Sequence, residues 1–337
     1  MNNLVILGAG KIGRMVTHLM ATCGDYAVRV GDVAQAAVDS LTKKYPQVKG
    51  QVVDFGNAQS LDAILKGAWA VVSCAPYHCN PLIAQRAKQH GVHYFDLTED
   101  VEVTHQVVEL SKNSKTLFAP QCGLAPGFIT IVANHLMRSM TDVSDLRLRV
   151  GALPRYPSNR LKYNLTWSTE GLINEYCNPC EAIVDGKLRE MPALEEMEHF
   201  SLDGVDYEAF NTSGGLGTLC ETLEGKVENL NYKTVRYPGH RDIVKTLVRD
   251  LRLGQRRDIL KDVLETAIPI TYQDVVLVFV TVSGQMRGQL TQESFARKIY
   301  AHKVDGQLMS AIQITTAAGM CAMVDLLVGG KLPRKGF

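Results

Sequence analysis

The 337-residue sequence lacks a strong bias of charge, a long uninterrupted apolar run and a secretion-type leader. Its 36 lysines and arginines nearly balance its 35 aspartates and glutamates, which leaves a formal net charge of +1 and no basic stripe. This balance argues against nucleic acid as a partner. No apolar run reaches the roughly 18 residues that a membrane span needs, and the first predicted strand already begins at Leu4. We therefore expect a cytoplasmic protein without a membrane partner.

Cysteine spacing provides no metal centre and no disulfide framework. The eight cysteines of a chain this long are best interpreted as reduced thiols. Cys177 and Cys180 have the C-x-x-C spacing of a redox or zinc site, but no second pair accompanies them and no thioredoxin-like strand precedes them. No nucleophile elbow, zinc spacing or P-loop follows residue 143. We expect no metal in this protein.

What the sequence does contain begins with a glycine-rich stretch after the first strand. The apolar run at residues 4–7 leads into Gly8, Gly10 and Gly13, which have the G-x-G-x-x-G spacing. The first glycine allows a tight turn, the second lets a pyrophosphate approach the backbone, and the third lets the helix pack closely on the strand. Because the motif stands between a strand and an amphipathic helical pattern, it predicts a dinucleotide site at the helix N-terminus.

Asp32 indicates which dinucleotide binds. It ends the second apolar run, 19 residues after Gly13, where the motif expects a carboxylate that accepts hydrogen bonds from the adenosine ribose. A carboxylate repels a 2′-phosphate, so we favour NAD over NADP. An ordinary acidic turn residue is the alternative. The predicted cofactor contacts in this part of the chain are Gly8, Gly10, Lys11, Ile12, Gly13, Asp32, Val33 and Asp54.

The length predicts two domains, because single cores rarely exceed roughly 250–300 residues. Residues 1–142 alternate strand-like and helical patterns, which is typical of a doubly wound parallel sheet of the Rossmann type. Ligands bind such sheets at the carboxyl ends of the strands. The loops that begin at Asp54, Cys74, Asp96 and Gly123 should therefore line one crevice.

Residues 143–304 show a different pattern, in which apolar and polar residues alternate. Examples are residues 146–150, 162–167, 207–210 and 289–301, which we expect to be strands. This pattern predicts an α+β domain with a mostly antiparallel sheet, which could cover the crevice of the first domain. A sheet-rich domain of this kind is compatible with a homodimer. Residues 305–337 contain a helix rich in small residues that we expect to pack against the first domain.

Several polar residues are candidates for chemistry, and each has a structural alternative. Asp96, Thr98 and Glu99 follow the fifth strand, but an acidic helix cap is equally consistent with them. Arg236 has the planar fork that binds a carboxylate at two points. His240 titrates near neutral pH, or it begins a helix after Pro238 and Gly239. Ser213 and the two glycines after it either offer N–H groups to an anion or form a turn.

Six motifs in order give the sequence a recognisable resemblance. They are Gly8–Gly13, Ala75-Pro76-Tyr77, Gly123–Gly127, Val150–Pro154, Thr166-Trp167-Ser168 and Arg236–His240. The chain resembles the saccharopine dehydrogenase family, and within it the lysine 6-dehydrogenase branch. The resemblance implies a Rossmann domain, a second domain for substrate binding and dimerisation, and oxidation of a lysine-type amine with NAD or NADP.

The resemblance also implies roles for single residues. It puts Ala75, Leu97, Thr98, Leu124, Pro126 and Ser168 around the nicotinamide half of the cofactor, with Pro76 in the same loop. At the substrate it puts Glu99, Thr234 and Arg236, and we expect Arg236 to hold the α-carboxylate. Our further predicted substrate contacts are Tyr77, Thr98 and Ser213. The candidate catalytic residues are Glu99, His240 and Asp96, one of which would act as the base for the amine.

Two departures bear on the substrate. Saccharopine reductases have an aspartate where this chain has Ala125 and a cysteine where it has Val150. They also tend to use NADP, with a basic residue where this chain has Asp32. These differences favour an NAD-linked, lysine-like reaction. The alternatives are a saccharopine dehydrogenase or reductase, a carboxynorspermidine-type reductase, and a dinucleotide-binding regulator that has lost the chemistry.

Overall fold

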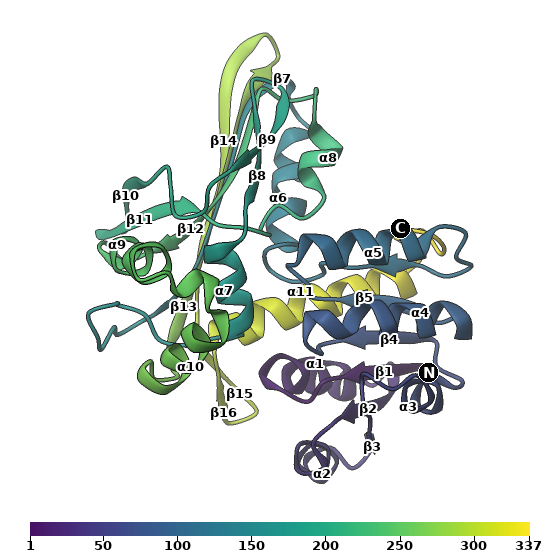
Figure 1. Cartoon of the computed structure of the whole chain (residues 1–337). Coiled ribbons are helices and arrows are strands. Elements are labelled where there is room, and N and C mark those ends of the chain that lie inside the picture. Colours follow the sequence, from purple (N-terminus) through teal and green to yellow (C-terminus); the bar gives the residue numbers. More distant parts are fainter. The chain divides into compact units, whose positions relative to one another are not determined.

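A computed structural model describes all 337 residues, which fold as two compact units. Unit 1 comprises residues 1–124 and 316–337, and unit 2 comprises residues 125–315 (Figure 1). The predicted fold class is confirmed: a parallel six-stranded sheet in unit 1 and a mainly antiparallel sheet in unit 2.

The sheet of unit 1 has the strand order β3-β2-β1-β4-β5-β6, and its neighbouring strands all run parallel. This is the strand order of a Rossmann sheet. The chain adds strands outward from β1 to β3 on one side and then from β4 to β6 on the other, so the order reverses between β1 and β4. Its strands are β1 (Asn2–Leu7), β2 (Tyr26–Asp32), β3 (Lys49–Val52), β4 (Ala70–Ser73), β5 (His93–Asp96) and β6 (Phe118–Ala119). The helices between them are α1 (Lys11–Thr22), α2 (Gln35–Lys44), α3 (Ala58–Leu65), α4 (Asn80–His90) and α5 (Val101–Ser111).

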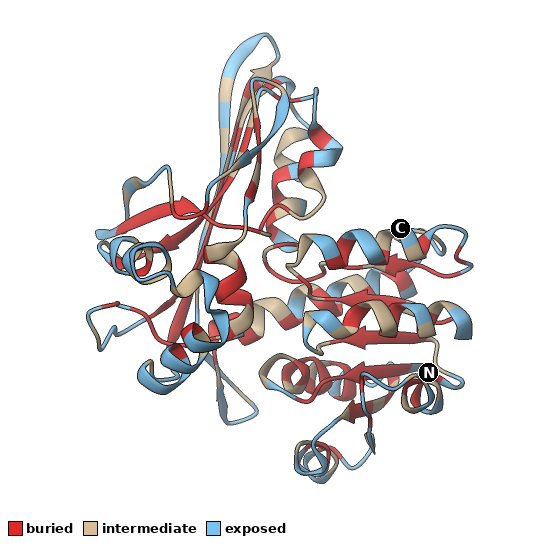
Figure 2. Ribbon diagram, viewed as in Figure 1, coloured by how far each residue is buried: buried red, intermediate tan, exposed pale blue.

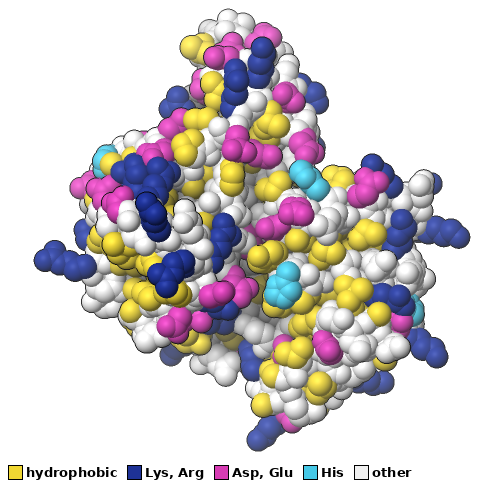
Figure 3. Space-filling view, viewed as in Figure 1, with side chains coloured by type: hydrophobic (Ala, Val, Ile, Leu, Met, Phe, Trp, Pro, Cys, Tyr) yellow, Lys and Arg dark blue, Asp and Glu magenta, His cyan; other side chains and the backbone are white.

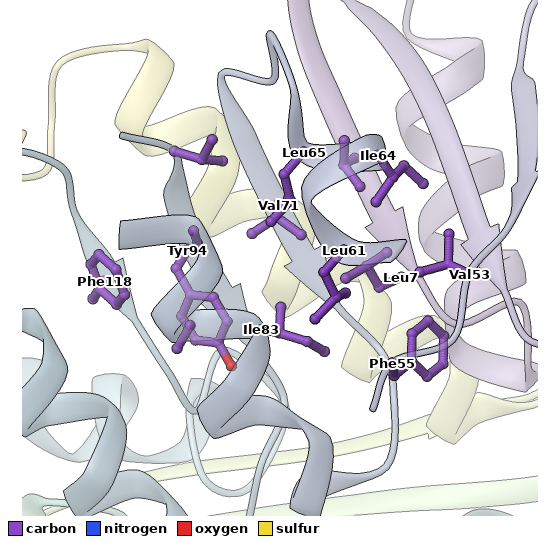
Figure 4. Close-up of a cluster of buried hydrophobic side chains, with 14 of the residues drawn as sticks. Leu7, Val53, Phe55, Leu61, Ile64, Leu65, Val71, Ile83, Tyr94 and Phe118 are labelled. Atoms are coloured by element: carbon purple, nitrogen blue, oxygen red, sulfur yellow. The ribbon is translucent and has the colours of Figure 1, made fainter. Parts of the chain in front are cut away.

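One face of this sheet packs against α3, α4 and α5 through the buried cluster that Figure 4 shows. Val5 and Leu7 belong to this cluster. Leu4 and Ile6, which alternate with them along β1, are not part of it but are also fully buried. Because successive side chains of a strand point to opposite faces, both faces of β1 are covered. Figure 2 shows the central strands β1, β4 and β5 as mostly buried, whereas the edge strand β3 is exposed. Covering of both faces explains why the central strands appear in the sequence as uninterrupted apolar runs.

The sheet of unit 2 is built around β7 (Thr141–Pro154) and β13 (Asp274–Met286), which pair antiparallel over most of their length. Its order is β10-β11-β12-β7-β13-β14, and β12 and β7 form its one parallel pair on this path. The other strands are β8 (Cys180–Val184), β9 (Lys187–Met191), β10 (Glu198–Leu202), β11 (Val205–Asn211), β12 (Asn229–Arg236) and β14 (Gln289–Tyr300). A separate hairpin joins β15 (His302–Val304) to β16 (Gln307–Met309).

One helix of unit 2 continues into a π-helical turn, and one segment that we expected to be a strand has no regular structure. Residues 240–250 form α9 (His240–Lys245) and a π-helical turn (Thr246–Asp250). The expected strand at residues 162–167 was wrong, since this segment has only an isolated bridge between Leu165 and Ile270. The remaining helices are α6 (Phe128–Met137), α7 (Thr169–Cys177), α8 (Leu219–Leu223) and α10 (Arg257–Ala267).

The last helix, α11 (Ala311–Val328), starts in unit 2 and ends in unit 1. By length and composition alone it could cross a membrane, although 44% of the relevant window is buried. Within unit 1 the Tyr26 hydroxyl donates to Asp325 Oδ1 (2.6 Å), and a Cβ at Gly319 would lie 2.8 Å from the Gly123 carbonyl oxygen. These contacts are those of a packed core helix, which passes the same length and composition test.

The start of α11 is fixed by a buried carboxylate. Asp274, which is fully buried, accepts hydrogen bonds from the backbone N–H groups of Ala311 and Ile312. Ser310 and Gln313 add a reciprocal capping box, since Ser310 N donates to Gln313 Oε1 (3.0 Å) and Gln313 N donates to Ser310 Oγ (3.2 Å). The first turn of α11 therefore has partners for N–H groups that a helix leaves open.

We predict that Asp274→Ala lowers the free energy of unfolding by about 1–3 kcal/mol, because two buried N–H groups lose their acceptor. Asn57→Ala, which removes the solvent-accessible cap of α3, should cost about 1 kcal/mol or less and serves as control. Thermal and urea unfolding measure both changes. An Asp274 variant as stable as the Asn57 variant would contradict the proposed importance of this cap.

Candidate functional site

The glycine motif forms a close backbone contact at the carboxyl end of β1. Gly8 has φ +98°, and a Cβ there would lie 2.6 Å from the Cys74 carbonyl oxygen at the end of β4. A Cβ at Gly13 would lie 1.8 Å from the Gly8 carbonyl oxygen. Around Gly10, by contrast, nothing lies within 4 Å of the Cβ position. The first and third glycines thus serve the packing of the fold, and the second leaves open space.

The N-terminus of α1 faces this open space without a side-chain cap. Gly10 is its N-cap residue and makes no side-chain cap hydrogen bond, and no acidic residue lies in the first turn. Lys11 and Ile12 are half-buried at the start of the helix. The N–H groups of a helix N-terminus and the positive end of the helix dipole suit an anion such as a pyrophosphate. The residues present therefore fit a dinucleotide.

Asp32 lies at the end of β2, next to the glycine loop. Its carboxylate accepts hydrogen bonds from Ala9 N (2.5 Å) and Ala34 N (2.9 Å). These two bonds fix the carboxylate beside the loop, while the following residue, Val33, is 59% exposed. The position and charge of Asp32 are those that the motif requires for contact with a ribose.

The other predicted cofactor residues of unit 1 follow the carboxyl ends of neighbouring strands. Asp54 is exposed, and its Oδ1 accepts from Gly56 N (2.9 Å). Ala75, Pro76 and Tyr77 follow β4, where Cys74 is buried enough to raise its thiol pKa to about 12. Leu97 follows β5, and the buried Leu124 ends the first segment of unit 1. Two predicted residues belong to unit 2 instead: Pro126 is buried, and the Ser168 hydroxyl caps α7 by accepting from Gly171 N (3.2 Å).

Asp96 is fully buried and each of its carboxylate oxygens is engaged. Oδ1 accepts from Thr98 N (2.9 Å) and Gln121 N (3.0 Å), and Oδ2 accepts from the Tyr94 hydroxyl (2.8 Å). Burial raises the pKa of Asp96, while these hydrogen bonds act in the opposite direction. The geometry favours a structural role, since Asp96 joins the loops that follow β5 and β6.

Thr98 and Glu99 complete this loop. Thr98 is buried, and its hydroxyl accepts from Asp100 N (3.3 Å), whereas Glu99 is half-buried. Asp100 then caps α5 by accepting from Val103 N (2.9 Å). The helix cap that the sequence offered as an alternative is thus Asp100, which leaves Glu99 as the candidate base of this loop.

Unit 2 contains a buried cluster of aromatic and charged side chains around Arg236. The Arg236 side chain is 3% exposed, and its guanidinium carbon lies 5.0 Å from the Tyr163 ring centre and 5.8 Å from that of Tyr176. Nε donates to the Tyr176 hydroxyl (2.9 Å), Nη1 donates to the Val235 carbonyl (3.0 Å), and Nη2 lies 3.7 Å from Glu175 Oε2. A buried guanidinium needs such partners to offset its desolvation.

His240 belongs to the same cluster, but both of its ring nitrogens have partners within the protein. Nδ1 lies 2.8 Å from the Leu161 carbonyl oxygen, and Nε2 lies 2.9 Å from the Tyr176 hydroxyl. Burial, together with the charge of Arg236, lowers its pKa from 6.5 to about 3. His240 is therefore neutral at physiological pH and packed at the start of a helix, as in the structural alternative above.

Two further predicted substrate residues make contacts within unit 2. The Thr234 hydroxyl lies 2.6 Å from that of Thr212, and both residues are buried. Ser213 N donates to the Glu175 carbonyl (3.0 Å), and Gly217 N donates to the Gly214 carbonyl (3.2 Å). The segment from Ser213 is thus a turn, the second of the two readings that its sequence allowed.

Sequence reasoning missed Tyr163, Glu175 and Tyr176, which surround Arg236. None of the three lies in a motif, and Tyr163 falls in the segment that we expected to be a strand. The available signal was indirect: a buried arginine requires polar and aromatic partners. The sequence does not show which distant residues supply them.

Comparison with known proteins supports the resemblance. A family model described as the saccharopine dehydrogenase NADP binding domain matches residues 4–119. A second, described as the saccharopine dehydrogenase C-terminal domain, matches residues 123–337. The chain belongs to the saccharopine dehydrogenase family. Its predicted membership is confirmed, and the family fits a pyridine nucleotide at the site in unit 1.

Curated relatives share low sequence identity with this family member. The mitochondrial alpha-aminoadipic semialdehyde synthase of Bos taurus is 20% identical over 317 residues, which cover 88% of this chain and 33% of the relative. The saccharopine dehydrogenase [NADP(+), L-glutamate-forming] of Saccharomyces cerevisiae is 22% identical over 281 residues, 79% of this chain and 61% of the relative. The matches thus span only part of the length of these relatives.

Solved structures share the fold. Apo saccharopine dehydrogenase (L-Glu forming) from Saccharomyces cerevisiae has a TM-score of 0.79 and 18% identity, with 100% of this chain and 93% of that chain covered. Homospermidine synthase from Legionella pneumophila, in complex with NAD, has a TM-score of 0.63 and 14% identity, with 99% and 85% covered.

The three glycines predict two distinct mutant phenotypes. Gly13→Ala should destabilise unit 1, because its Cβ meets the Gly8 carbonyl oxygen. Gly10→Ala should fold normally, since nothing in the protein lies near its Cβ, and yet weaken dinucleotide affinity about tenfold or more by occupying the space of the pyrophosphate. Thermal unfolding and fluorescence titration with NADH separate the two effects. Unchanged affinity in a folded Gly10→Ala protein would place the dinucleotide elsewhere.

Proposed function

We propose that this chain is an oxidoreductase that uses a pyridine nucleotide to oxidise the CH–NH group of lysine or of a lysine-derived amino acid. The observation that carries the proposal is the combination of an anion-ready helix N-terminus in unit 1 with a buried guanidinium in unit 2. Membership of a dehydrogenase family supports it. The names of the relatives, which include a saccharopine dehydrogenase and a semialdehyde synthase, agree with a lysine-derived substrate.

The residues of this chain would divide the work as follows. Backbone N–H groups after Gly10 bind the pyrophosphate, and Asp32 accepts hydrogen bonds from the ribose. A bound nicotinamide supplies the acceptor for the hydride. Arg236 binds the α-carboxylate of the amino acid. Burial disfavours its charge, but the neighbouring Tyr163 ring and the ion pair with Glu175 outweigh this effect, so the fork stays protonated at every relevant pH.

The amine of the substrate must be neutral before a hydride can leave the neighbouring carbon. A free lysine amine has a pKa of about 10.4, so the site has to desolvate it or provide a base. Of the three predicted bases, Asp96 is held by hydrogen bonds on both oxygens and His240 on both nitrogens. We therefore assign the base to Glu99, which is half-buried in the loop after β5.

For the cofactor we propose NAD, with NADP as the alternative. Asp32 carries a negative charge where a 2′-phosphate would lie, and its carboxylate is fixed by Ala9 N and Ala34 N. The matching family model is described as NADP binding, and one relative is named as an NADP enzyme. The charge of Asp32 is our reason to expect the other preference in this chain. A cytoplasmic location and a homodimer likewise remain predictions.

Turnover is the direct test of the proposed function. Purified protein with NAD should produce NADH with L-lysine or with saccharopine. Arg236→Lys should raise the KM of that amino acid about tenfold, because a point charge replaces the two-point fork.

Imine substrates with NADH test the reductase alternatives. Tight NAD binding without turnover of any substrate would favour the regulator. An unchanged KM in Arg236→Ala would remove this residue from the substrate site.

Cofactor preference tests the role of Asp32. We expect the wild type to bind NADH more tightly than NADPH, and Asp32→Ser to lose about tenfold or more in NADH affinity while it gains NADPH affinity, since hydrogen bonds to the ribose and the repulsion of a phosphate both disappear. Asp39→Ser, which changes an exposed carboxylate on α2, is the matched control. Fluorescence titration measures all three proteins. A wild type that prefers NADPH would contradict the assignment.

A further inference from the structure

His240, which the sequence suggested as a proton carrier, occupies a different place in the structure. It lies between the Tyr163 ring (5.4 Å between centres), the Tyr176 ring (5.8 Å) and the Phe210 ring (6.4 Å), and it is 1% exposed. Arg236 donates to the same Tyr176 hydroxyl that His240 contacts. His240 thus has no path to solvent of its own.

The direction of each hydrogen bond in this group follows from chemistry. The Leu161 carbonyl oxygen can only accept, so His240 Nδ1 must carry a proton and donate to it (2.8 Å). In the neutral ring Nε2 is then an acceptor, and the Tyr176 hydroxyl donates to it (2.9 Å). Arg236 Nε can only donate, and it donates to the oxygen of that same hydroxyl (2.9 Å). One arrangement of protons satisfies all three bonds.

A buried carboxylate holds the backbone on either side of His240. Glu208 on β11 is 2% exposed, and it accepts hydrogen bonds from Gly239 N (2.7 Å) and Arg241 N (2.6 Å). The Arg241 side chain points away, toward the Leu194 carbonyl (2.7 Å) and Glu195 (3.0 Å). The main chain and the ring of His240 are therefore both fixed, which suits an anchor better than a group that must exchange protons.

We infer that Tyr176 and His240 are positioning residues that hold the Arg236 guanidinium in one orientation through a chain of hydrogen bonds with fixed direction. The chain runs from Arg236 Nε through the Tyr176 hydroxyl and the His240 ring to the Leu161 carbonyl. With Nε held by Tyr176 and Nη1 by the Val235 carbonyl, the guanidinium cannot rotate about its last bond. The remaining N–H groups, on the Nη2 side, lie near the Glu175 carboxylate (Nη2 to Oε2, 3.7 Å), which restricts their direction as well.

This inference rests on the proposed function, in which Arg236 binds the carboxylate of the substrate. It assigns specificity, rather than proton transfer, to His240. Orientation matters because a planar fork binds a carboxylate at two points only when their planes coincide. Loss of the chain should therefore weaken substrate binding and leave the chemical step almost unchanged, which is the kinetic sign of lost binding shared by ground state and transition state.

Three substitutions separate positioning from base catalysis. Tyr176→Phe removes the central hydroxyl, and His240→Leu removes both nitrogen atoms of the ring. Each variant should raise the KM of the amino acid about tenfold and change kcat less than about threefold. His240→Gln keeps one donor and one acceptor but cannot carry a proton at neutral pH, and it should restore KM to within about threefold of wild type. Tyr45→Phe, which removes another buried tyrosine–histidine hydrogen bond (2.9 Å), is the control and should leave both constants unchanged.

Nitrogen NMR of the full chain labelled with ¹⁵N-histidine tests the chain without turnover. The signal that His240→Gln removes, among those of nine histidines, identifies His240. It should show a neutral ring protonated at Nδ1 from pH 5 to pH 9. A ring that titrates in this range, or one protonated at Nε2, overturns the inference.

Two kinetic outcomes would contradict the inference, and they can be told apart. If all His240 variants, Gln included, lose kcat together and lose one limb of the pH–rate profile, His240 is the base. If no variant changes KM, the chain does not position Arg236 for substrate. A wild-type protein that neither turns over an amino acid nor binds one in calorimetry contradicts the proposed function. The role of Arg236 in substrate binding is then wrong as well. The NMR signature still reports whether the hydrogen-bond chain exists.

Discussion

The dinucleotide unit depends on one close backbone approach, where the turn after β1 returns to begin α1. At 1.8 Å from the Gly8 carbonyl oxygen, no Cβ fits at Gly13, so glycine is required there by space alone. The approach places the first turn of α1 over the end of β1 with its N–H groups uncapped. At Gly10 an added Cβ would have nothing within 4 Å, so the packing of the fold does not require glycine there. The proposed contact with a pyrophosphate would account for it.

A second constraint governs unit 2, where a full positive charge is buried. An isolated guanidinium in the interior costs several kcal/mol, and Arg236 is stabilised by an ion pair, two tyrosine rings and two hydrogen bonds. Each partner also restricts the motion of the side chain. The same contacts that make burial tolerable therefore also restrict the direction of the fork.

Ordinary side-chain chemistry does not decide the role of a residue in such surroundings. Histidine and aspartate are the usual proton carriers, and the sequence placed Asp96 and His240 among the candidates for that reason. Both lie where every polar atom of the side chain is engaged and where burial disfavours the charged form. Glu99 is half-buried in the loop that follows β5. Surface loops next to a rigid sheet are the usual location of catalytic groups.

The sequence by itself determined the parallel sheet, the glycine turn and the carboxylate at Asp32, because these features depend on neighbours in the chain and on apolar runs that need two covered faces. The helix at residues 311–328 and the strands at residues 146–150, 207–210 and 289–300 were predictable for the same local reason. Tertiary structure alone decided that residues 162–167 form no strand and that Tyr163, Glu175 and Tyr176 surround Arg236. Local patterns specify an element, whereas burial and the partner of a polar atom depend on segments that are far apart in the chain and meet only in the fold.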